Sequence, residues 1–289
     1  MRLLAAAFAS LTLLAAAPAA PPAPAAPTFA YDPARTSCQA GSAAADGTIP
    51  FTVAGPDVPT THGVLVLPAH PAAAGGAVLW SHWLGAVATT NHTEFLVDAQ
   101  ALAERGVRSL LLDMPWSQPD WFTKVRAPDH DYADTVAAVL LLRRSLDCLA
   151  ALPHVDPARI AVVGHDFGAM TSALLLAVDR RPSYAVLMAP ALTFWEWYLL
   201  GGPPADQGAY VAQMSVLDLP GWLTRGQQHG TLLQFAKNDQ YVAESTGVAF
   251  YNATPNRDRA IKVYDLGHDL EDETAHEDRV AWLLVRVGG

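Results

Sequence analysis

Short runs of aliphatic residues alternate along this sequence with longer runs of helical spacing, and this alternation restricts the fold more than any other feature. Strands are expected at 49–54, 63–68, 77–81, 108–113, 159–164, 184–189, 231–235 and 261–265, and helices at 91–104, 132–150, 169–178, 242–251 and 276–287. Strands joined through helices need crossover connections, which produce a mostly parallel sheet with helices on both faces. The sequence therefore predicts an α/β protein with an eight-stranded, mostly parallel sheet.

The alternation is interrupted twice. No helix separates the first two strands, which predicts an antiparallel hairpin at one edge of the sheet. Between 192 and 229 an aromatic cluster and a Gly/Pro-rich stretch replace the expected pattern, which indicates a short cap inserted between two strands. Hydrophobic residues make up 51% of the chain and charged residues 16%, enough apolar surface for one large core. We expect a single domain over 49–289.

The N-terminus has the composition of an export signal. A positive charge at Arg2 is followed by an apolar run and by small residues through Ala17, the order found in secretory signals. The interpretation is a signal peptide with an Ala/Pro tract over 1–26 and an N-terminal arm over 27–48. The apolar run is too short to span a bilayer, so we expect a secreted or periplasmic protein without a stable membrane span.

If the protein is exported, its two cysteines are in an oxidising compartment. Cys38 and Cys148 form a disulfide in an oxidising compartment, or else Cys148 is a small buried hydrophobe while Cys38 lies in the arm. Both alternatives are open.

The net charge is -10 and Lys and Arg do not cluster, which argues against nucleic acid as a partner.

The strongest chemical motif is Gly164-His165-Asp166-Phe167-Gly168, which lies between an apolar strand and a helix. A nucleophile elbow needs such glycines because the sharp turn leaves no room for side chains beside the nucleophile. Asp166 takes the nucleophile position, and the Phe167 N–H is one expected oxyanion donor. His165 is expected to be a packed or hydrogen-bonded residue. The alternative is an ordinary turn in which Asp166 caps the helix.

Two further residues complete a catalytic order. Asp239 follows a strand and His268 follows the last strand, so nucleophile, acid and histidine occur in the order of the α/β-hydrolase fold. We therefore predict a triad of Asp166, His268 and Asp239. Alternatively, Asp239 caps the next helix and His268 is a surface loop residue.

A second oxyanion donor is expected after strand 77–81, where His82-Trp83-Leu84-Gly85 forms a turn. The donor is the backbone N–H of Trp83 or Leu84, unless the turn is only a buried aromatic element.

Other side chains are candidates for binding the substrate, namely His82, Trp195, Trp197 and Tyr198, although the three aromatic residues could instead seal the cap onto the core. The Asp129-His130-Asp131 triplet could suggest a metal, but it precedes a helix, where Asp is favoured as a cap. No metal site is expected.

From about Thr61 onwards the chain resembles the dienelactone-hydrolase-like and acyl-esterase branch of the α/β-hydrolases. The residues that carry this resemblance are 152–157, 159–168, 238–242 and Gly267-His268. That branch has Cys or Ser as nucleophile. Gly-His-Asp-x-Gly instead resembles the elbow of epoxide hydrolases and of haloalkane and haloacid dehalogenases. Those enzymes commonly have Trp after the nucleophile, where this chain has Phe167, and epoxide hydrolases often have His-Gly-x-Pro where it has 82–85.

The carboxylate favours one chemistry. Attack on an ester carbonyl would give a mixed anhydride, whereas attack on a saturated carbon gives a stable alkyl ester. We therefore expect a small organic epoxide or halide as substrate, a covalent ester on Asp166 and no cofactor. His268 is expected to activate the water that hydrolyses this ester, while Asp239 orients the imidazole and stabilises its cation. One alternative is an ester or lactone hydrolase in which Asp166 is a base for water or takes part in acyl transfer. Another is a non-catalytic binding protein or pseudoenzyme.

Overall fold

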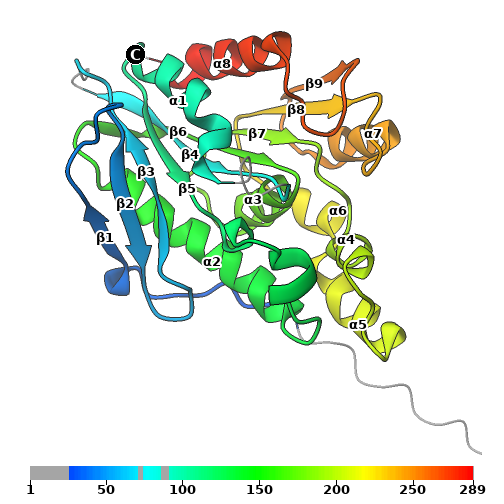
Figure 1. Cartoon of the computed structure of the whole chain (residues 1–289). Coiled ribbons are helices and arrows are strands. Elements are labelled where there is room, and N and C mark those ends of the chain that lie inside the picture. Colours follow the sequence, from blue (N-terminus) through cyan, green and yellow to red (C-terminus); the bar gives the residue numbers. More distant parts are fainter. Residues whose placement is uncertain (1–25, 71–73, 86–90, 289) are drawn as a thin grey trace, which may run out of the picture.

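The computed structural model describes residues 26–70, 74–85 and 91–288. These residues form a nine-stranded sheet in the order β1-β2-β3-β5-β4-β6-β7-β8-β9 (Figure 1). The strands are β1 Ser37–Ala40, β2 Ile49–Ala54, β3 Thr61–Val66, β4 Gly75–Ser81, β5 Arg108–Leu112, β6 Val155–His165, β7 Tyr184–Met188, β8 Gly230–Ala236 and β9 Asp258–Tyr264. The pairs β1–β2, β2–β3 and β3–β5 are antiparallel and the rest of the sheet is parallel.

All eight expected strands are present, with bounds that differ from the expected ones by a few residues. The sheet has one strand more than the sequence predicted. The additional strand is β1, which lies in the stretch interpreted as an arm and pairs with β2. All four of its residues are exposed, so its sequence has no apolar pattern that would predict a strand. The β2–β3 hairpin therefore exists but does not form the sheet edge, which β1 occupies.

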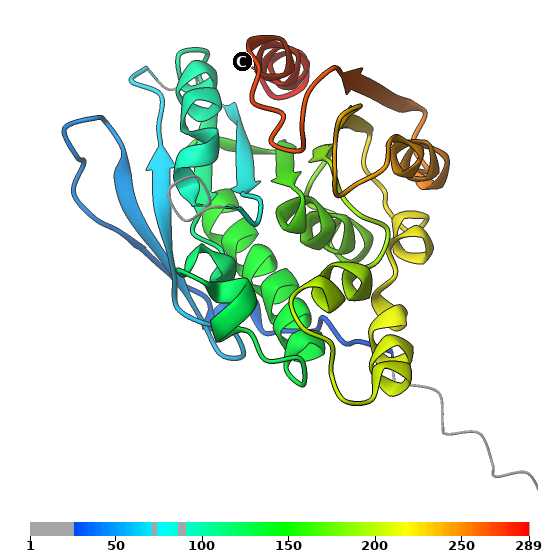
Figure 2. The same ribbon diagram turned by 45° about the vertical axis from the view of Figure 1, so that its right-hand side comes forward.

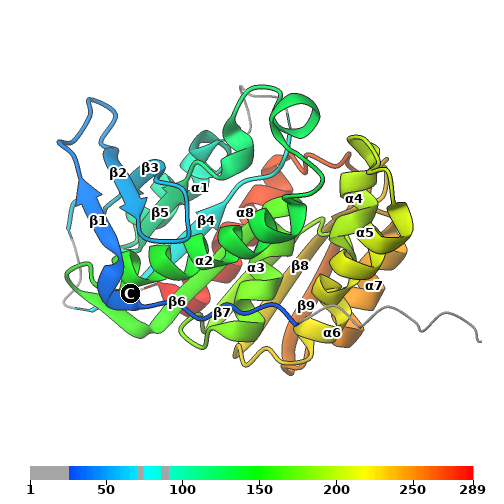
Figure 3. The same cartoon turned by 90° about the horizontal axis from the view of Figure 1, so that it is seen from below.

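Helices cover both faces of the sheet. On one face lie α2 Asp131–Ala150, α3 Phe167–Val178, α6 Leu219–Leu223 and α7 Glu244–Ala253 (Figure 3). On the other face α1 Leu96–Ala103 and α8 Glu273–Val287 lie side by side (Figure 2). Because both faces are covered, the inner strands β4, β6, β7 and β8 are almost wholly buried along their apolar lengths.

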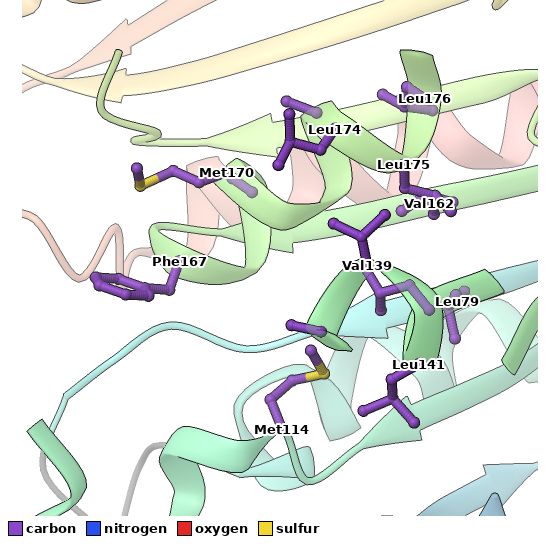
Figure 4. Close-up of a cluster of buried hydrophobic side chains, with 14 of the residues drawn as sticks. Leu79, Met114, Val139, Leu141, Val162, Phe167, Met170, Leu174, Leu175 and Leu176 are labelled. Atoms are coloured by element: carbon purple, nitrogen blue, oxygen red, sulfur yellow. The ribbon is translucent and has the colours of Figure 1, made fainter. Parts of the chain in front are cut away.

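The larger of the two hydrophobic clusters lies on the α2–α3 face. Phe167, Met170 and Leu174 of α3 belong to this cluster together with Val139 and Leu141 of α2, and Figure 4 shows Val139 directed toward α3. These side chains are at most 1% exposed. Since α3 begins directly after the candidate nucleophile, this packing fixes the position of the elbow.

The predicted cap is found between β7 and β8. It contains α4 Phe194–Leu200, α5 Gln207–Met214, a short 3-10 turn at Ser215–Leu217, and α6. In Figure 1, α4 and α5 project from the body of the molecule at the side where the parallel strands end, whereas α6 packs against α3. The sequence left open whether the aromatic residues of the cap line the substrate pocket or seal the cap onto the core. Phe194 of α4 is fully buried, so this part of the cap is packed onto the core.

The N-terminal segment is attached to this body at several points. Cys38 and Cys148 form a disulfide, so the first of the two alternatives for the cysteines is the observed one. The Tyr31 hydroxyl donates to Asp147 at 2.7 Å, and Phe29 packs edge-on against Trp222. In Figure 3 this dark-blue segment runs from beside α6 to β1. In the described part of the chain, no helix has the length and apolar character needed to cross a membrane.

Candidate active site

The elbow is formed by the turn between β6 and α3. Asp166 has φ +50° and ψ −114°, a conformation that is costly for any residue other than glycine. Its N–H donates to the Met188 carbonyl at 2.8 Å, which helps hold the turn. A Cβ on Gly168 would lie 2.1 Å from the Ser81 carbonyl oxygen, and one on Gly164 would lie 2.4 Å from the Gly168 oxygen. The glycine spacing thus predicted the turn correctly, and the Asp166 side chain does not cap the helix.

The three predicted triad residues meet at the carboxyl ends of β6, β8 and β9. His268 Nδ1 lies 2.7 Å from Asp239 Oδ2, and His268 Nε2 lies 3.9 Å from Asp166 Oδ2. The second distance is too long for a hydrogen bond but short enough for a strong charge interaction. The other Asp239 oxygen accepts the N–H groups of Tyr241 and Val242. Asp239 therefore orients the imidazole and also holds its own loop.

The two carboxylates determine the charge of the histidine. Burial on its own would lower the pKa of His268, but Asp166 and Asp239 outweigh this effect and raise the pKa to about 9. Burial likewise opposes ionisation of Asp239, yet the hydrogen bond and charge of His268 lower the pKa of that carboxyl. At neutral pH, His268 is consequently an imidazolium that donates its Nδ1 proton to Asp239.

One backbone N–H of the turn after β4 is directed at the elbow. Leu84 donates to Asp166 Oδ2 at 3.2 Å, which fits the expected oxyanion donor. The N–H of Trp83, the other candidate, is directed at a different group and donates to Glu94 Oε2 at 2.9 Å. Phe167 begins α3, and its ring is buried among aromatic residues.

A buried cluster that the sequence did not reveal connects these parts. His165 Nδ1 lies 2.7 Å from Glu94 Oε1, and His165 Nε2 lies 2.9 Å from the His268 carbonyl oxygen. Because a carbonyl can only accept, Nε2 donates to it, and Nδ1 forms the hydrogen bond with the Glu94 carboxyl group. The Trp83 ring stacks on His165 with a centroid distance of 5.4 Å. His165 is hydrogen-bonded as expected, whereas nothing in the sequence distinguished Glu94 within its predicted helix.

His82 has a structural position rather than a place in the cavity wall. It is 1% exposed, and burial lowers its pKa to about 4, so it is neutral. Its Nε2 accepts the Met114 N–H at 2.9 Å, its Nδ1 therefore donates to the Trp83 carbonyl at 2.8 Å, and Ser117 Oγ is 2.9 Å from Nε2. The prediction that His82 contacts substrate is not supported, because protein groups occupy both ring nitrogens.

A cavity of about 790 Å³ opens beside His268. Aromatic residues form much of its wall, namely Trp83, Trp116, Trp121, Phe122, Trp197 and Tyr241. The ring centroids of Trp83, Trp197 and Tyr241 lie 5.2 to 5.9 Å from that of His268. Asp166 is fully buried and does not line the cavity, and its Oδ1 has no hydrogen-bond partner among the described residues. Among the described residues, His268 and Leu84 connect this cavity with the elbow.

Of the three predicted aromatic contacts, only Trp197 lines this cavity. Trp195 is two residues earlier on α4, about 200° away around the helix, and so faces elsewhere. Tyr198 is buried with its hydroxyl 3.0 Å from Thr135 Oγ1, and it lines a neighbouring cavity of about 540 Å³ that contains no triad residue. The two cavities share Trp116, Gln118 and Trp121.

The acidic triplet at 129–131 has a structural use. Asp131 is the first residue of α2, is 1% exposed, and forms a two-pronged ion pair with Arg126. No group of three or more His, Cys, Asp or Glu side chains within the described ranges is arranged to hold a metal ion.

Comparison with known proteins identifies the fold. No protein-family model and no curated protein sequence matches the chain. Among solved structures, the acetyl xylan esterase from Paenibacillus sp. R4 is 21% identical with a TM-score of 0.66, covering 87% of this chain and 88% of its own. Acetyl xylan esterase 1 from Thermoanaerobacterium sp. JW/SL YS485 is 17% identical with a TM-score of 0.68, covering 88% of each chain.

Est1E from Butyrivibrio proteoclasticus is 16% identical with a TM-score of 0.62, covering 86% of this chain and 98% of its own. Together with the mostly parallel sheet and the order of its strands, these likenesses establish the α/β-hydrolase fold. The expected similarity to epoxide hydrolases and dehalogenases is not shown by these structures.

Proposed function

We propose that this protein is a hydrolase that cleaves a carboxylic ester or lactone of a small organic molecule bound beside His268. The observation that carries the proposal is the convergence of Asp166 and Asp239 on His268, which lines the cavity. Two of the similar structures are acetyl xylan esterases, which supports ester chemistry over epoxide or halide hydrolysis. Fold similarity alone does not determine activity, so the site has to account for the reaction.

In this mechanism Asp166 acts as a base. Direct attack by a carboxylate on an ester would give a mixed anhydride, so water is the better nucleophile. Asp166 does not line the cavity, so the water has to pass between Leu84 and His268 to reach its buried, unpartnered Oδ1. There Asp166 accepts one proton of the water, and the water oxygen attacks the carbonyl carbon. The Phe167 N–H stabilises the oxyanion that forms, together with the Leu84 N–H, which donates to Asp166 Oδ2 before the substrate binds.

His268 acts as the acid. Its imidazolium donates the Nε2 proton to the departing alkoxide, and Asp239 holds the ring during the transfer. The proton gained by Asp166 then returns to His268 across the 3.9 Å that separates them. The products are one carboxylic acid and one alcohol, and both side chains regain their initial charges.

A second candidate is hydrolysis of an epoxide or a carbon–halide bond through a covalent alkyl ester on Asp166. A specific observation favours it: an anionic oxygen already stands at the elbow and needs no base to attack. Alkylation would neutralise Asp166, which is one of the two groups that raise the pKa of His268. The histidine would then lose its proton more readily and could activate water in the second step.

Hydrolysis of p-nitrophenyl esters and of simple lactones tests the first proposal. We expect the Asp166→Asn and His268→Gln variants to lose about 10²- to 10⁴-fold in kcat/KM, as for removal of a general base or acid. Glu104→Gln, an exposed residue at the end of α1, is the control and should be unchanged. Ester turnover that survives Asp166→Asn would refute the role of Asp166.

Mass spectrometry of denatured protein separates the two candidates. His268→Gln is incubated with panels of epoxides, haloalkanes and esters. A stable adduct with the mass of the alkyl group on Asp166 supports the second candidate, and ester turnover by the wild-type protein without any adduct supports the first. No turnover and no labelling on any panel would leave a non-catalytic binding protein or pseudoenzyme.

We also propose that the chain is exported after removal of a signal within 1–26, which leaves the segment 27–48, including strand β1, as part of the domain that continues over 49–289. The charge and hydrophobicity pattern around Arg2 supports this, and the Cys38–Cys148 disulfide suits an oxidising compartment. N-terminal sequencing of the protein from fractionated cells tests the proposal, and an intact Met1 on cytoplasmic protein would contradict it.

A further inference from the structure

The charged groups around the cavity are unevenly distributed. Among the described residues that line it, Asp120 and Asp269 are acidic, His268 is the only cation, and no Lys or Arg is present. A ligand in this cavity therefore meets no fixed lysine or arginine in the described wall.

The one cation of the wall is already matched by anions. His268 lies between Asp166 and Asp239, so the triad carries one more negative than positive charge. Asp120 is paired with Lys124 at 2.8 Å, whereas the exposed Asp269 side chain makes no ion pair with any described residue. Arg126, in the adjacent loop, is bound by both oxygens of Asp131. The mouth of the cavity is therefore net negative.

The aromatic wall adds to this preference. The faces of aromatic rings carry partial negative charge and attract cations, most strongly at Trp. Four of the six aromatic side chains in the wall are Trp, and Trp83 and Trp197 already lie against the imidazolium of His268. A quaternary ammonium group would meet rings and carboxylates here, whereas a carboxylate or sulfonate would meet the same groups with unfavourable sign.

We infer that this cavity selects ligands by charge, binding cationic groups of quaternary ammonium type best, neutral groups less well and anionic groups worst. As a statement about substrates, this rests on the proposed ester hydrolysis, and it names esters of cationic or neutral alcohols as the substrate class. As a statement about binding, it is independent of any reaction.

Binding is measured first, on the full chain, at 0.15 M salt so that long-range effects of net charge are screened. Benzyltrimethylammonium, benzyl alcohol and benzenesulfonate serve as cationic, neutral and anionic probes, followed through tryptophan fluorescence. We expect the cation to bind about 3- to 30-fold more tightly than the neutral probe. The anion should bind more weakly than both. Equal affinities, or tighter binding of the anion, would overturn the inference.

Substitutions of residues in the cavity wall test whether this order of affinities arises in the cavity. Asp269→Asn should reduce the advantage of the cation about 2- to 5-fold, because it removes one exposed charge at short range. Trp197→Leu should weaken all probes and the cation most. Glu104→Gln changes the net charge equally, far from the site, and should have no effect. If Asp269→Asn and Glu104→Gln behave alike, the cavity does not select by charge.

Turnover is measured separately with acetylcholine, its carbon isostere 3,3-dimethylbutyl acetate, and 3-sulfopropyl acetate. We expect kcat/KM to follow the same order. Charge-ordered binding without turnover of any ester would leave the inference standing and would refute the proposed hydrolysis. Turnover in the reverse order would refute the inference and leave the hydrolysis standing.

Discussion

At the scale of single residues, the unusual feature is an imidazole held between two carboxylates. If a neutral nucleophile stood in the place of Asp166, His268 would have only one anionic neighbour, Asp239. Here both neighbours are anionic, and the pKa of His268 rises to about 9. A histidine that is charged at neutral pH is prepared to donate a proton rather than to accept one, which is why we assign it to the leaving group.

The raised pKa of His268 makes stability depend on pH. The folded pKa lies above the unfolded value of about 6.5, so the stabilisation is fully present below pH 6.5 and is lost as pH rises through 9. The difference between the two pKa values corresponds to about 3 kcal/mol of stability. We expect urea unfolding to show wild-type stability falling between pH 6.5 and 9.5, and His268→Gln falling less.

The pKa of His276 is also raised, chiefly by its hydrogen bond to Asp98, but both proteins share this group and the comparison cancels it. If His268→Gln loses as much stability over this range as the wild type, His268 is not the group that titrates.

Glu94 provides a second prediction at this scale. Its carboxylate accepts the Trp83 N–H and bonds His165, which in turn holds the His268 carbonyl. Glu94→Ala leaves these buried groups unpaired, and we expect a loss of about 1–3 kcal/mol in urea unfolding and a lower kcat with little change in KM. Glu94→Gln keeps both hydrogen bonds and should restore most of the stability. Equal effects of Ala and Gln would argue against a positioning role.

At the scale of elements, the β6–α3 turn is the part that the sequence defines most sharply. Two glycines let α3 start immediately against β4, and the packing of α3 on α2 then fixes the elbow. The cap illustrates the opposite situation. Its aromatic residues are adjacent in sequence, yet helical geometry directs Trp197 to the cavity beside His268 and Trp195 away from it.

The close packing at the elbow lets us predict the effect of adding one methyl group at Gly168. A Cβ on Gly168 would lie 2.1 Å from the Ser81 carbonyl oxygen, so Gly168→Ala should force α3 away from β4 and cost at least about 1–3 kcal/mol. Gly221→Ala in α6 is the matched control, since nothing lies within 4 Å of its added Cβ. Chemical unfolding of both variants tests this, and equal midpoints would contradict it.

At the scale of the whole molecule, the disulfide and the N-terminal segment connect distant parts of the chain. Cys38 lies on the outermost strand β1, and Cys148 lies on α2, 110 residues further on. The triad lies on the opposite side of the sheet order, at β6, β8 and β9. We therefore expect loss of this disulfide to lower the stability of the whole protein but to have little effect on the geometry of the site.

We expect the Cys38→Ser/Cys148→Ser variant to lose about 2–5 kcal/mol of stability, since a crosslink across a long loop restricts the unfolded chain. Its hydrolytic activity at 25 °C should remain close to that of the wild type. Guanidinium unfolding and ester turnover on the same preparation test both statements. A loss of activity in protein that is still folded would show that β1 influences the site.

The sequence by itself determined the layers, the parallel sheet, the cap insertion and the three converging triad positions. These features depend on periodicity, on glycine spacing and on the rule that parallel strands end at one edge, all of which are local in the chain. It did not predict β1, because an exposed edge strand needs only backbone pairing with β2 and no apolar pattern.

The tertiary structure alone decided the roles of Trp83, Glu94 and His82, and the charge of His268. The sequence does not distinguish Trp83 from Leu84 as oxyanion donor, and only the folded structure directs the Leu84 N–H to the elbow and the Trp83 N–H to Glu94. The pKa of an imidazole depends on charges a few ångströms away, whichever part of the chain supplies them. Hydrogen-bond partners and neighbouring charges are therefore known only once the chain has folded.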